Sequence, residues 1–170
     1  MAKSIRPPLQ LIVGEILPLW GKPYVLEINS GRATAKLAET IMLSAQHAAN
    51  LDHRKSILEN WYRNQLATAI ADLQPQLEAI VGKSAESVSI RWMKTRWGSC
   101  NIAAKRINLN LELVKLDPLC LQYTLTHELC HLIVRGHGHD FYTQMDRCFP
   151  RWRHAKALLK QDPIGQSFWE

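Results

Sequence analysis

Four of the seven histidines in the chain lie within one short stretch, HELCHLIVRGHGHDFY, which spans residues 127–142. His127 and His131 are four residues apart, so on a helix their imidazoles lie on the same face and can share one metal ion. Glu128 lies next to them, where its carboxylate can reach a metal-bound water rather than the metal itself. This HExxH pattern is typical of zinc hydrolases and predicts a catalytic zinc site.

A catalytic zinc site needs a third protein ligand, which here must come from beyond the helix. His137 follows His131 by six residues and stands after Gly136, where the chain can turn back toward the metal. We therefore expect His137 to be the third ligand, with His139 as the competing ligand and Asp140 as a weaker one. The histidine that does not bind the metal can instead orient a ligand or stabilise an oxyanion.

The helix that carries the HExxH motif is predicted independently of its histidines. Asp117 can cap its start, and Pro118 suits its first position. Its apolar pattern runs through LCLQYTLTHELCHLIVR, and Gly136 can end it. The preceding segment RINLNLELV, residues 106–114, alternates apolar and polar side chains, which predicts a strand with one polar face.

The upstream half of the chain predicts a hairpin followed by a helix. A Gly-Lys-Pro turn at Gly21 indicates a hairpin, and the periodicity of residues 33–46 fits either a strand or a helix. A helix is expected over residues 52–81, with Asp52 as its cap and an interruption at Pro75.

The order of strands, helix, strands and helices predicts an α+β fold, with the helices packed on one side of a sheet. In the downstream half we expect a strand over residues 87–97, a turn over 98–105, and short helices over about 140–148 and 151–160. We expect one domain over residues 1–170. Its parts are a β-hairpin region at about 9–48, the helix at about 52–81 and a catalytic part at about 87–160.

The composition fits a globular protein with a net charge of +6. The 170 residues are 46% hydrophobic and 21% charged, which suits a core of ordinary size. Glu15 and Pro18 interrupt the apolar stretch LQLIVGEILPLW, so it predicts neither a signal peptide nor a membrane span, and we expect a cytoplasmic protein. The four cysteines form no CxxC pair, which argues against a disulfide framework or a cysteine zinc site.

Three stretches together resemble the YgjP-like metallopeptidases, which belong with the SprT-like proteins among the zincins. These stretches are MKTRWGSC at residues 93–100, RINLNLELV, and LTHELCHLIVRGHGHDFY. The resemblance covers roughly residues 17–160. It implies a zincin-like fold, in which a small twisted sheet packs on the HExxH helix, and one Zn²⁺ per chain.

The resemblance also implies roles for individual residues. It makes Glu128 the catalytic residue, and it implies that the strand before the HExxH helix borders the cleft, which would place Asn108 and Asn110 there. The implied zinc ligands are His127, His131 and His137.

Our main hypothesis is a zinc-dependent metallopeptidase that acts on a peptide or protein. Zinc-bound water, activated by Glu128, would attack a peptide carbonyl, and Glu128 would then pass the proton to the leaving amine. The developing oxyanion needs a donor besides zinc, and the candidates are His139, Tyr142 and Arg96.

Two alternative functions remain open. The first is a nucleotide phosphoanhydride hydrolase that releases pyrophosphate at the same zinc site, although the sequence has no GxxxxGK phosphate loop. The second is a nucleic-acid-associated SprT-like protease or binding module, suggested by a basic segment beside Phe149 and Trp152. Such a charge run is more often a solvated helix face. The basic residues of this segment are Arg147, Arg151, Arg153, Lys156 and Lys160.

Overall fold

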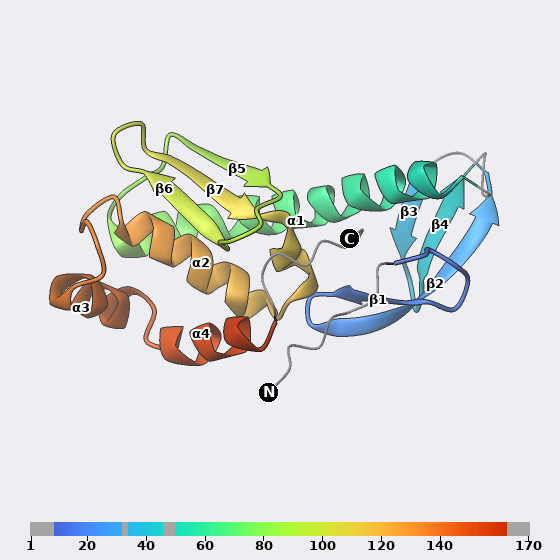
Figure 1. Ribbon diagram of the computed structural model, residues 1–170. Helices are drawn as coiled ribbons and strands as arrows, with labels where there is room; N and C mark the ends of the chain where they lie inside the picture. The colour runs from blue at the N-terminus through green and yellow to red at the C-terminus, as the bar shows by residue number, and fades with distance from the viewer. Residues whose placement is uncertain (1–8, 32–33, 46–49, 163–170) are drawn as a thin grey trace.

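The computed structural model describes residues 9–31, 34–45 and 50–162. Its backbone is arranged along one long helix, α1 (Leu51–Val81), with a β-sheet near each end of that helix (Figure 1). Three shorter helices follow the second sheet. The α+β class expected from the sequence is therefore confirmed.

The start of α1 differs from the prediction by its capping residue. Asn50, not Asp52, is the N-cap, and its side-chain oxygen accepts a hydrogen bond of 3.0 Å from the backbone N–H of His53. Asp52 lies inside the first turn, where a negative charge stabilises the helix dipole. The helix ends at Gly82, whose φ of 80° is left-handed.

Pro75 lies inside α1 without interrupting it, so the predicted break is wrong. A proline within a helix removes one hydrogen bond and clashes with the preceding turn, at a cost of about 3 kcal/mol. Leu77 and Val81 on the following turns are buried in the core. Their packing holds the end of the helix in place, because tertiary burial contributes more to helix stability than local propensity does.

The first sheet has the strand order β1-β2-β4-β3. Its strands are β1 (Ile16–Leu19), β2 (Lys22–Ser30), β3 (Thr34–Leu37) and β4 (Ile41–Ala45). β1 and β2 form the predicted antiparallel hairpin around Gly21, whose φ is 76°. The segment that fitted either a strand or a helix forms β3 and β4. β4 pairs with β2 in parallel, and its Ile41 and Leu43 are fully buried.

The second sheet has the strand order β5-β7-β6 and lies beside the HExxH helix (Figure 1). Its strands are β5 (Ser87–Arg91), β6 (Gly98–Asn101) and β7 (Arg106–Asn110). β7 pairs in parallel with β5 and antiparallel with β6. Two expectations are corrected, because the first strand ends at Arg91 and the segment that begins at Gly98, expected to be a turn, forms the edge strand β6.

The strand predicted over residues 106–114 ends early, at Asn110. The side-chain oxygen of Asn110 accepts a hydrogen bond of 3.2 Å from the backbone N–H of Glu112, which starts the 3₁₀ helix η1 (Leu111–Lys115). The strict alternation of the sequence cannot reveal this change, since Leu111 and Leu113 are buried in η1 just as the predicted strand would bury them.

Three helices complete the chain: α2 (Pro118–Cys130), α3 (His139–Cys148) and α4 (Trp152–Gln161). As predicted, Asp117 caps α2 and accepts a hydrogen bond of 2.8 Å from Leu119 N. The contacts of α2 include α1, β6, β7, α3 and α4, so this helix lies at the centre of the C-terminal part. A small sheet thus packs on the HExxH helix, as expected for a zincin-like fold.

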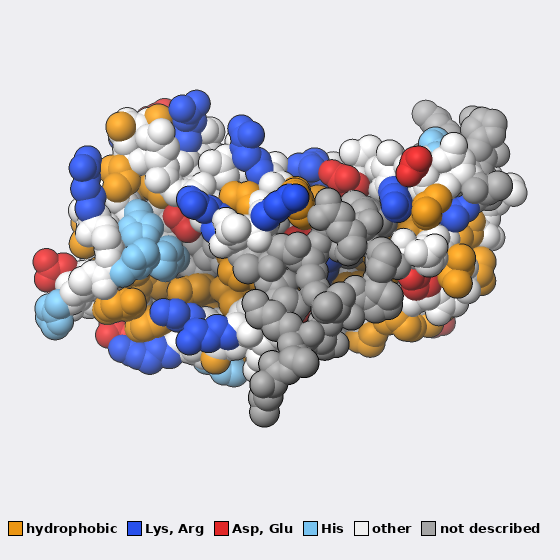
Figure 2. Space-filling model, in the orientation of Figure 1, with side chains coloured by type: hydrophobic (Ala, Val, Ile, Leu, Met, Phe, Trp, Pro, Cys, Tyr) orange, Lys and Arg blue, Asp and Glu red, His pale blue; other side chains and the backbone are white. Residues whose placement is uncertain are grey.

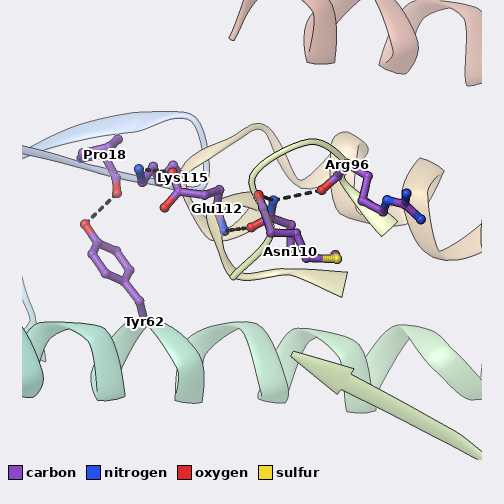
Figure 3. A network of polar contacts seen from close by, with 7 residues as sticks. Pro18, Tyr62, Arg96, Asn110, Glu112 and Lys115 are labelled. Carbon is purple, nitrogen blue, oxygen red and sulfur yellow. Dashed lines mark hydrogen bonds and ion pairs between the residues drawn. The ribbon is translucent and has the colours of Figure 1, made fainter. Parts of the chain in front are cut away.

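A polar network joins the N-terminal hairpin, α1 and η1 (Figure 3). The Tyr62 hydroxyl on α1 donates a hydrogen bond of 2.8 Å to Pro18 O in β1. Glu112 and Lys115 form a buried ion pair within η1. Burial raises the pKa of Tyr62, and the nearby charge of Glu112 raises it further, so the phenol remains a donor.

In the part of the chain that the structure describes, none of the helices combines the length and the apolar character needed to cross a bilayer. The extent of the domain, residues 1–170, stays a prediction.

Candidate metal centre

Three histidine side chains converge at the C-terminal end of α2. The Nε2 atoms of His127 and His131 lie 3.2 Å apart, those of His131 and His137 3.2 Å, and those of His137 and His127 3.0 Å. Imidazole nitrogens that share a tetrahedral Zn²⁺ at about 2.0–2.1 Å are separated by roughly 3.3 Å. The donor set and its spacing therefore fit one metal ion, and histidine side chains gather visibly at this end of the molecule (Figure 2).

The end of α2 brings His137 to the other two histidines. The helix stops at Cys130, and His131 is its C-cap, whereas the sequence pattern predicted a helix that continued to Gly136. The backbone N–H of Val134 donates to Cys130 O at 2.9 Å, and Gly136 adopts a φ of 75°. This turn reverses the chain, which explains how a residue six positions after His131 returns to the same point.

The ring of Phe141 on α3 fixes the three imidazoles from one side. Phe141 is fully buried, and its centroid lies 4.8 Å from that of His127, 4.6 Å from His131 and 4.9 Å from His137. Nδ1 of His131 lies 3.2 Å from Val134 O. A carbonyl oxygen can only accept, so Nδ1 carries the proton and Nε2 of neutral His131 keeps a lone pair for a metal.

The electrostatic environment keeps His127 and His131 neutral. Burial lowers the pKa of His127 to about 3, with smaller contributions from His131, His137 and the positive charge of Lys156. Burial also lowers the pKa of His131. Because a metal binds the neutral imidazole, a depressed pKa prepares the ligand without the removal of a proton at neutral pH.

Glu128 lies beside this cluster and is buried on α2, with 6% of its surface exposed. Burial raises the pKa of its carboxyl to about 7, and the charge of Arg96 opposes that rise. A carboxylate with a pKa near the working pH can both accept and return a proton.

The strand β6 approaches Glu128 so closely that it leaves room only for a glycine. A Cβ at Gly98 would lie 2.6 Å from Glu128 Oε1 and 2.9 Å from Thr124 Cγ2. The conformation of Gly98 is open to any residue, so close approach alone requires glycine here. The edge strand β6 therefore borders the site at Gly98.

A cavity of about 460 Å³ opens beside His127 and Glu128, within the range typical of small-ligand pockets. Its wall combines residues of β6, α2 and α4. The lining residues are Trp97, Gly98, Tyr123, Thr124, His127, Glu128, Lys156, Leu159, Lys160 and Asp162.

The structure separates the other predicted site residues. Asn110 is fully buried, where its side-chain nitrogen donates to Met93 O at 2.8 Å and Arg96 O at 3.0 Å (Figure 3), and it does not line the cavity. Asn108 accepts from Arg91 Nε and donates to Ser99 Oγ, and it does not line the cavity.

The three expected oxyanion donors also differ in position. Arg96 is exposed, and its charge acts on Glu128. Tyr142 is half-buried and stacks on Trp152, with ring centroids 5.2 Å apart. His139 is exposed at the first position of α3. Neither Tyr142 nor His139 lines the cavity.

Sequence reasoning missed Tyr123 and Gly98. The Tyr123 hydroxyl lies 3.4 Å from His127 Nδ1 and lines the cavity. Its position four residues before His127 on the same helix was the available signal. No local pattern predicts the contact of Gly98 with Glu128, because that contact spans thirty positions of the sequence.

The basic C-terminal segment does not expose the aromatic rings expected of a base-stacking surface. Phe149 and Trp152 are buried, with 6% and 7% of their surfaces exposed. Arg153 pairs with Asp146 and lies over the Trp152 ring, 4.4 Å from its centroid. Trp152 instead joins α4 to α3 through its contacts with Asp146 and Tyr142.

Comparison with known proteins adds a family match that covers most of the chain. Residues 2–162 match the model of the YgjP-like metallopeptidase domain. Two solved structures are similar: the metallopeptidase zymogens of Pyrococcus abyssi abylysin, with 26% identity and a TM-score of 0.47, and of Methanocaldococcus jannaschii jannalysin, with 23% and 0.48. Each match covers 54% of this chain, and 90% and 94% of the respective zymogen chains. No curated protein sequence matches.

Proposed function

The chain belongs to the YgjP-like metallopeptidase family, and from this premise we propose that it is a zinc-dependent peptidase whose catalytic base is Glu128. Membership makes the chain a metal-dependent hydrolase with a peptide or protein as the substrate class, as the sequence resemblance led us to expect. The observation that carries the proposal is the convergence of three imidazole Nε2 atoms beside a buried carboxylate at the wall of a cavity.

His127, His131 and His137 would hold the metal. Three neutral imidazoles that leave one position open suit Zn²⁺ in a catalytic site. When bound, the ion supplies Lewis-acid stabilisation of negative charge and lowers the pKa of water. Supporting contacts to Phe141 and Val134 O orient the imidazoles before any metal arrives.

Glu128 accepts the proton of the attacking water and then delivers it to the leaving amine. Its carboxyl reaches the cavity from α2 and is held in place by the backbone of β6 at Gly98. Burial raises the pKa of this carboxyl to about 7, so the group can both accept a proton and release it near neutral pH. The positive charge of Arg96 favours the ionised form that is needed for the first transfer.

We assign the donor toward the developing oxyanion to Tyr123. When His127 Nε2 is used as a ligand, Nδ1 carries the proton and donates to the Tyr123 oxygen at 3.4 Å. The phenolic hydrogen is then free to point into the cavity, toward a substrate carbonyl. Burial raises the pKa of Tyr123 to about 12, so the phenol stays protonated through the working range of pH.

The decisive experiment compares the parent protein with Glu128→Gln for zinc content and for hydrolysis of an unfolded protein. We expect one zinc per chain in both, with turnover lost in the variant alone. Glu86→Gln, which alters an exposed carboxylate paired with Lys105, is the matched control and should keep the parental rate. An intact rate in Glu128→Gln would refute the assignment of the base, and a parent that takes up no zinc would refute the site.

One observation favours a second candidate, hydrolysis of a nucleotide phosphoanhydride at the same site. Lys156 and Lys160 line the cavity and could contact phosphate oxygens. Release of pyrophosphate from nucleoside triphosphates, dependent on zinc and on Glu128, would support this candidate. Zinc-loaded protein that cleaves a polypeptide and leaves triphosphates intact would exclude it.

A further inference from the structure

One wall of the cavity is formed by α4 and differs in charge from the wall formed by β6 and α2. It contributes Lys156, Leu159 and Lys160, and Asp162 follows the end of the helix. Two positive side chains and one negative side chain leave this wall with a net charge of +1 (2 − 1). In Figure 2, Lys and Arg side chains accordingly lie beside hydrophobic side chains close to the histidines.

Lys156 lines the same cavity as His127, and its positive charge acts on that histidine. It is half-buried, and its Nζ lies 5.5 Å from the centroid of Trp152 and 5.8 Å from that of Tyr142. Within the described part of the chain, Lys156 forms no ion pair. Its ammonium group is thus held by aromatic faces at the cavity wall, where an anionic ligand can reach it.

The rest of the cavity is largely apolar. Trp97, Tyr123 and Leu159 contribute aromatic and aliphatic surface to the same cavity as Lys156 and Glu128. An apolar stem can therefore lie along these residues while a charged end meets the lysines. This combination selects a ligand with a hydrocarbon part and a single anionic terminus.

We propose that this cavity is a specificity pocket for a substrate residue that carries a carboxylate, and that Lys156, assisted by Lys160, binds that carboxylate. The inference rests on the proposed peptidase function and names its substrate class. Lys156 and Lys160 supply positive charge for one carboxylate, whereas a nucleoside triphosphate would bring several negative charges into a cavity that Glu128 and Asp162 also line. The carboxylate can belong to an acidic side chain or to the C-terminus of the peptide.

Four labelled peptides separate these two sources. They have the same length and an otherwise alanine sequence, carry either Glu or Gln at one fixed position, and end in either a carboxylate or a carboxamide. Binding is measured by fluorescence anisotropy with zinc-loaded Glu128→Gln protein, so that affinity is read without turnover. We expect the matching carboxylate to improve affinity roughly tenfold or more over its amide partner.

Variants of Lys156 identify the residue responsible. Lys156→Met keeps an unbranched side chain and removes only the charge, so it should abolish the carboxylate preference, whereas Lys156→Arg should retain it. Lys22→Met removes an exposed cation of the N-terminal sheet and is the control, with the preference unchanged. Thermal melts of each variant verify that the fold is intact.

The outcomes distinguish the pocket from the proposed function. Equal binding of carboxylate and amide peptides, or a preference that survives in Lys156→Met, overturns the pocket. Binding of a nucleoside triphosphate that depends on Lys156, without peptide discrimination, overturns it in favour of nucleotides. If the parent cleaves no peptide but the Lys156-dependent preference is present, the pocket stands and the peptidase function fails.

Discussion

Replacing Gly98 by alanine tests whether β6 positions the carboxylate of Glu128, which we propose as the catalytic base. The added Cβ would lie 2.6 Å from Glu128 Oε1 and 2.9 Å from both Glu128 Cγ and Thr124 Cγ2. Ordinary contact begins at 3.4 Å, so the nearest pair must separate by 0.8 Å (3.4 − 2.6). Both neighbours are buried on α2, which limits their room to move. Either β6 shifts away from the helix or Glu128 leaves its position.

The expected effects on stability and on activity follow from this displacement. Overpacking of a filled interior costs about 1–3 kcal/mol of the free energy of unfolding. A displacement approaching 1 Å at a reacting group can cost about 100-fold in rate, so we expect kcat/KM to fall roughly tenfold to 100-fold. Zinc affinity should change little, because the histidines are not among the nearest neighbours of the added atom.

The assay measures kcat/KM on a polypeptide substrate, the urea midpoint and the zinc content of Gly98→Ala. Gly31→Ala is the control, since its added Cβ would meet only Ser44 Cβ at an ordinary 3.8 Å. The double variant Gly98→Ala/Thr124→Ser removes one of the three close contacts and should recover part of the stability. Parental activity and an unchanged urea midpoint in Gly98→Ala would show that Glu128 is not held by β6.

Three further variants and one titration probe the rest of the structure. His137→Ala should weaken zinc binding by more than about 100-fold, measured by competition with a chelator, because loss of a group that only supports a ligand already costs about 10–100-fold in affinity. An unchanged zinc affinity would make His139 or Asp140 the third ligand. Asn110→Ala should lower the free energy of unfolding by about 2–4 kcal/mol, since two backbone carbonyls and one backbone N–H lose their hydrogen-bond partner. An unchanged urea midpoint would contradict a stabilising role for these hydrogen bonds. Pro75→Ala should raise stability by up to about 3 kcal/mol by restoring a helical hydrogen bond, and a lower melting temperature would argue against this. In metal-free Glu128→Gln protein, the free energy of unfolding should fall as the pH drops from 6.5 toward 3. The pKa of His127 is about 3 in the folded protein and 6.5 in the unfolded chain, so only the unfolded chain binds the proton in that window. If the dependence of this free energy on pH is the same after the further substitution His127→Phe, the explanation is refuted.

The local part of the site could be predicted from the sequence because it depends on the geometry of one helix. Asp117 and Pro118 specify the start of α2, and the spacing of four residues places His127 and His131 on one face. Gly136 marks the turn that returns His137 to them. These residues interact over at most ten positions, so regular helix geometry and one glycine determine their approach. The zinc ion and the catalytic roles of these residues stay predictions.

Errors arose where packing between distant segments overrides a local pattern. Pro75 remains helical because Leu77 and Val81 are buried, and no property of the segment itself reveals that burial. Asn110 reads as the polar face of a strand, yet it is enclosed by the backbone of residues 93–96 and turns the chain into η1. In both cases the free energy comes from contacts that exist only after the chain has folded.

The sequence by itself determined the hydrolase class, since the HExxH helix and the following histidine bring three imidazoles and a carboxylate together within one short segment. Tertiary structure decided what surrounds them. β6 reaches Glu128 at Gly98, thirty positions before it, and α4 brings Lys156 to the cavity from the C-terminal side. Helical periodicity constrains neighbours within one or two turns, whereas the shape and charge of a pocket depend on which elements pack against one another. The histidines and the carboxylate are therefore brought together locally, whereas the shape and charge of the cavity beside them come from the packing of β6, α2 and α4.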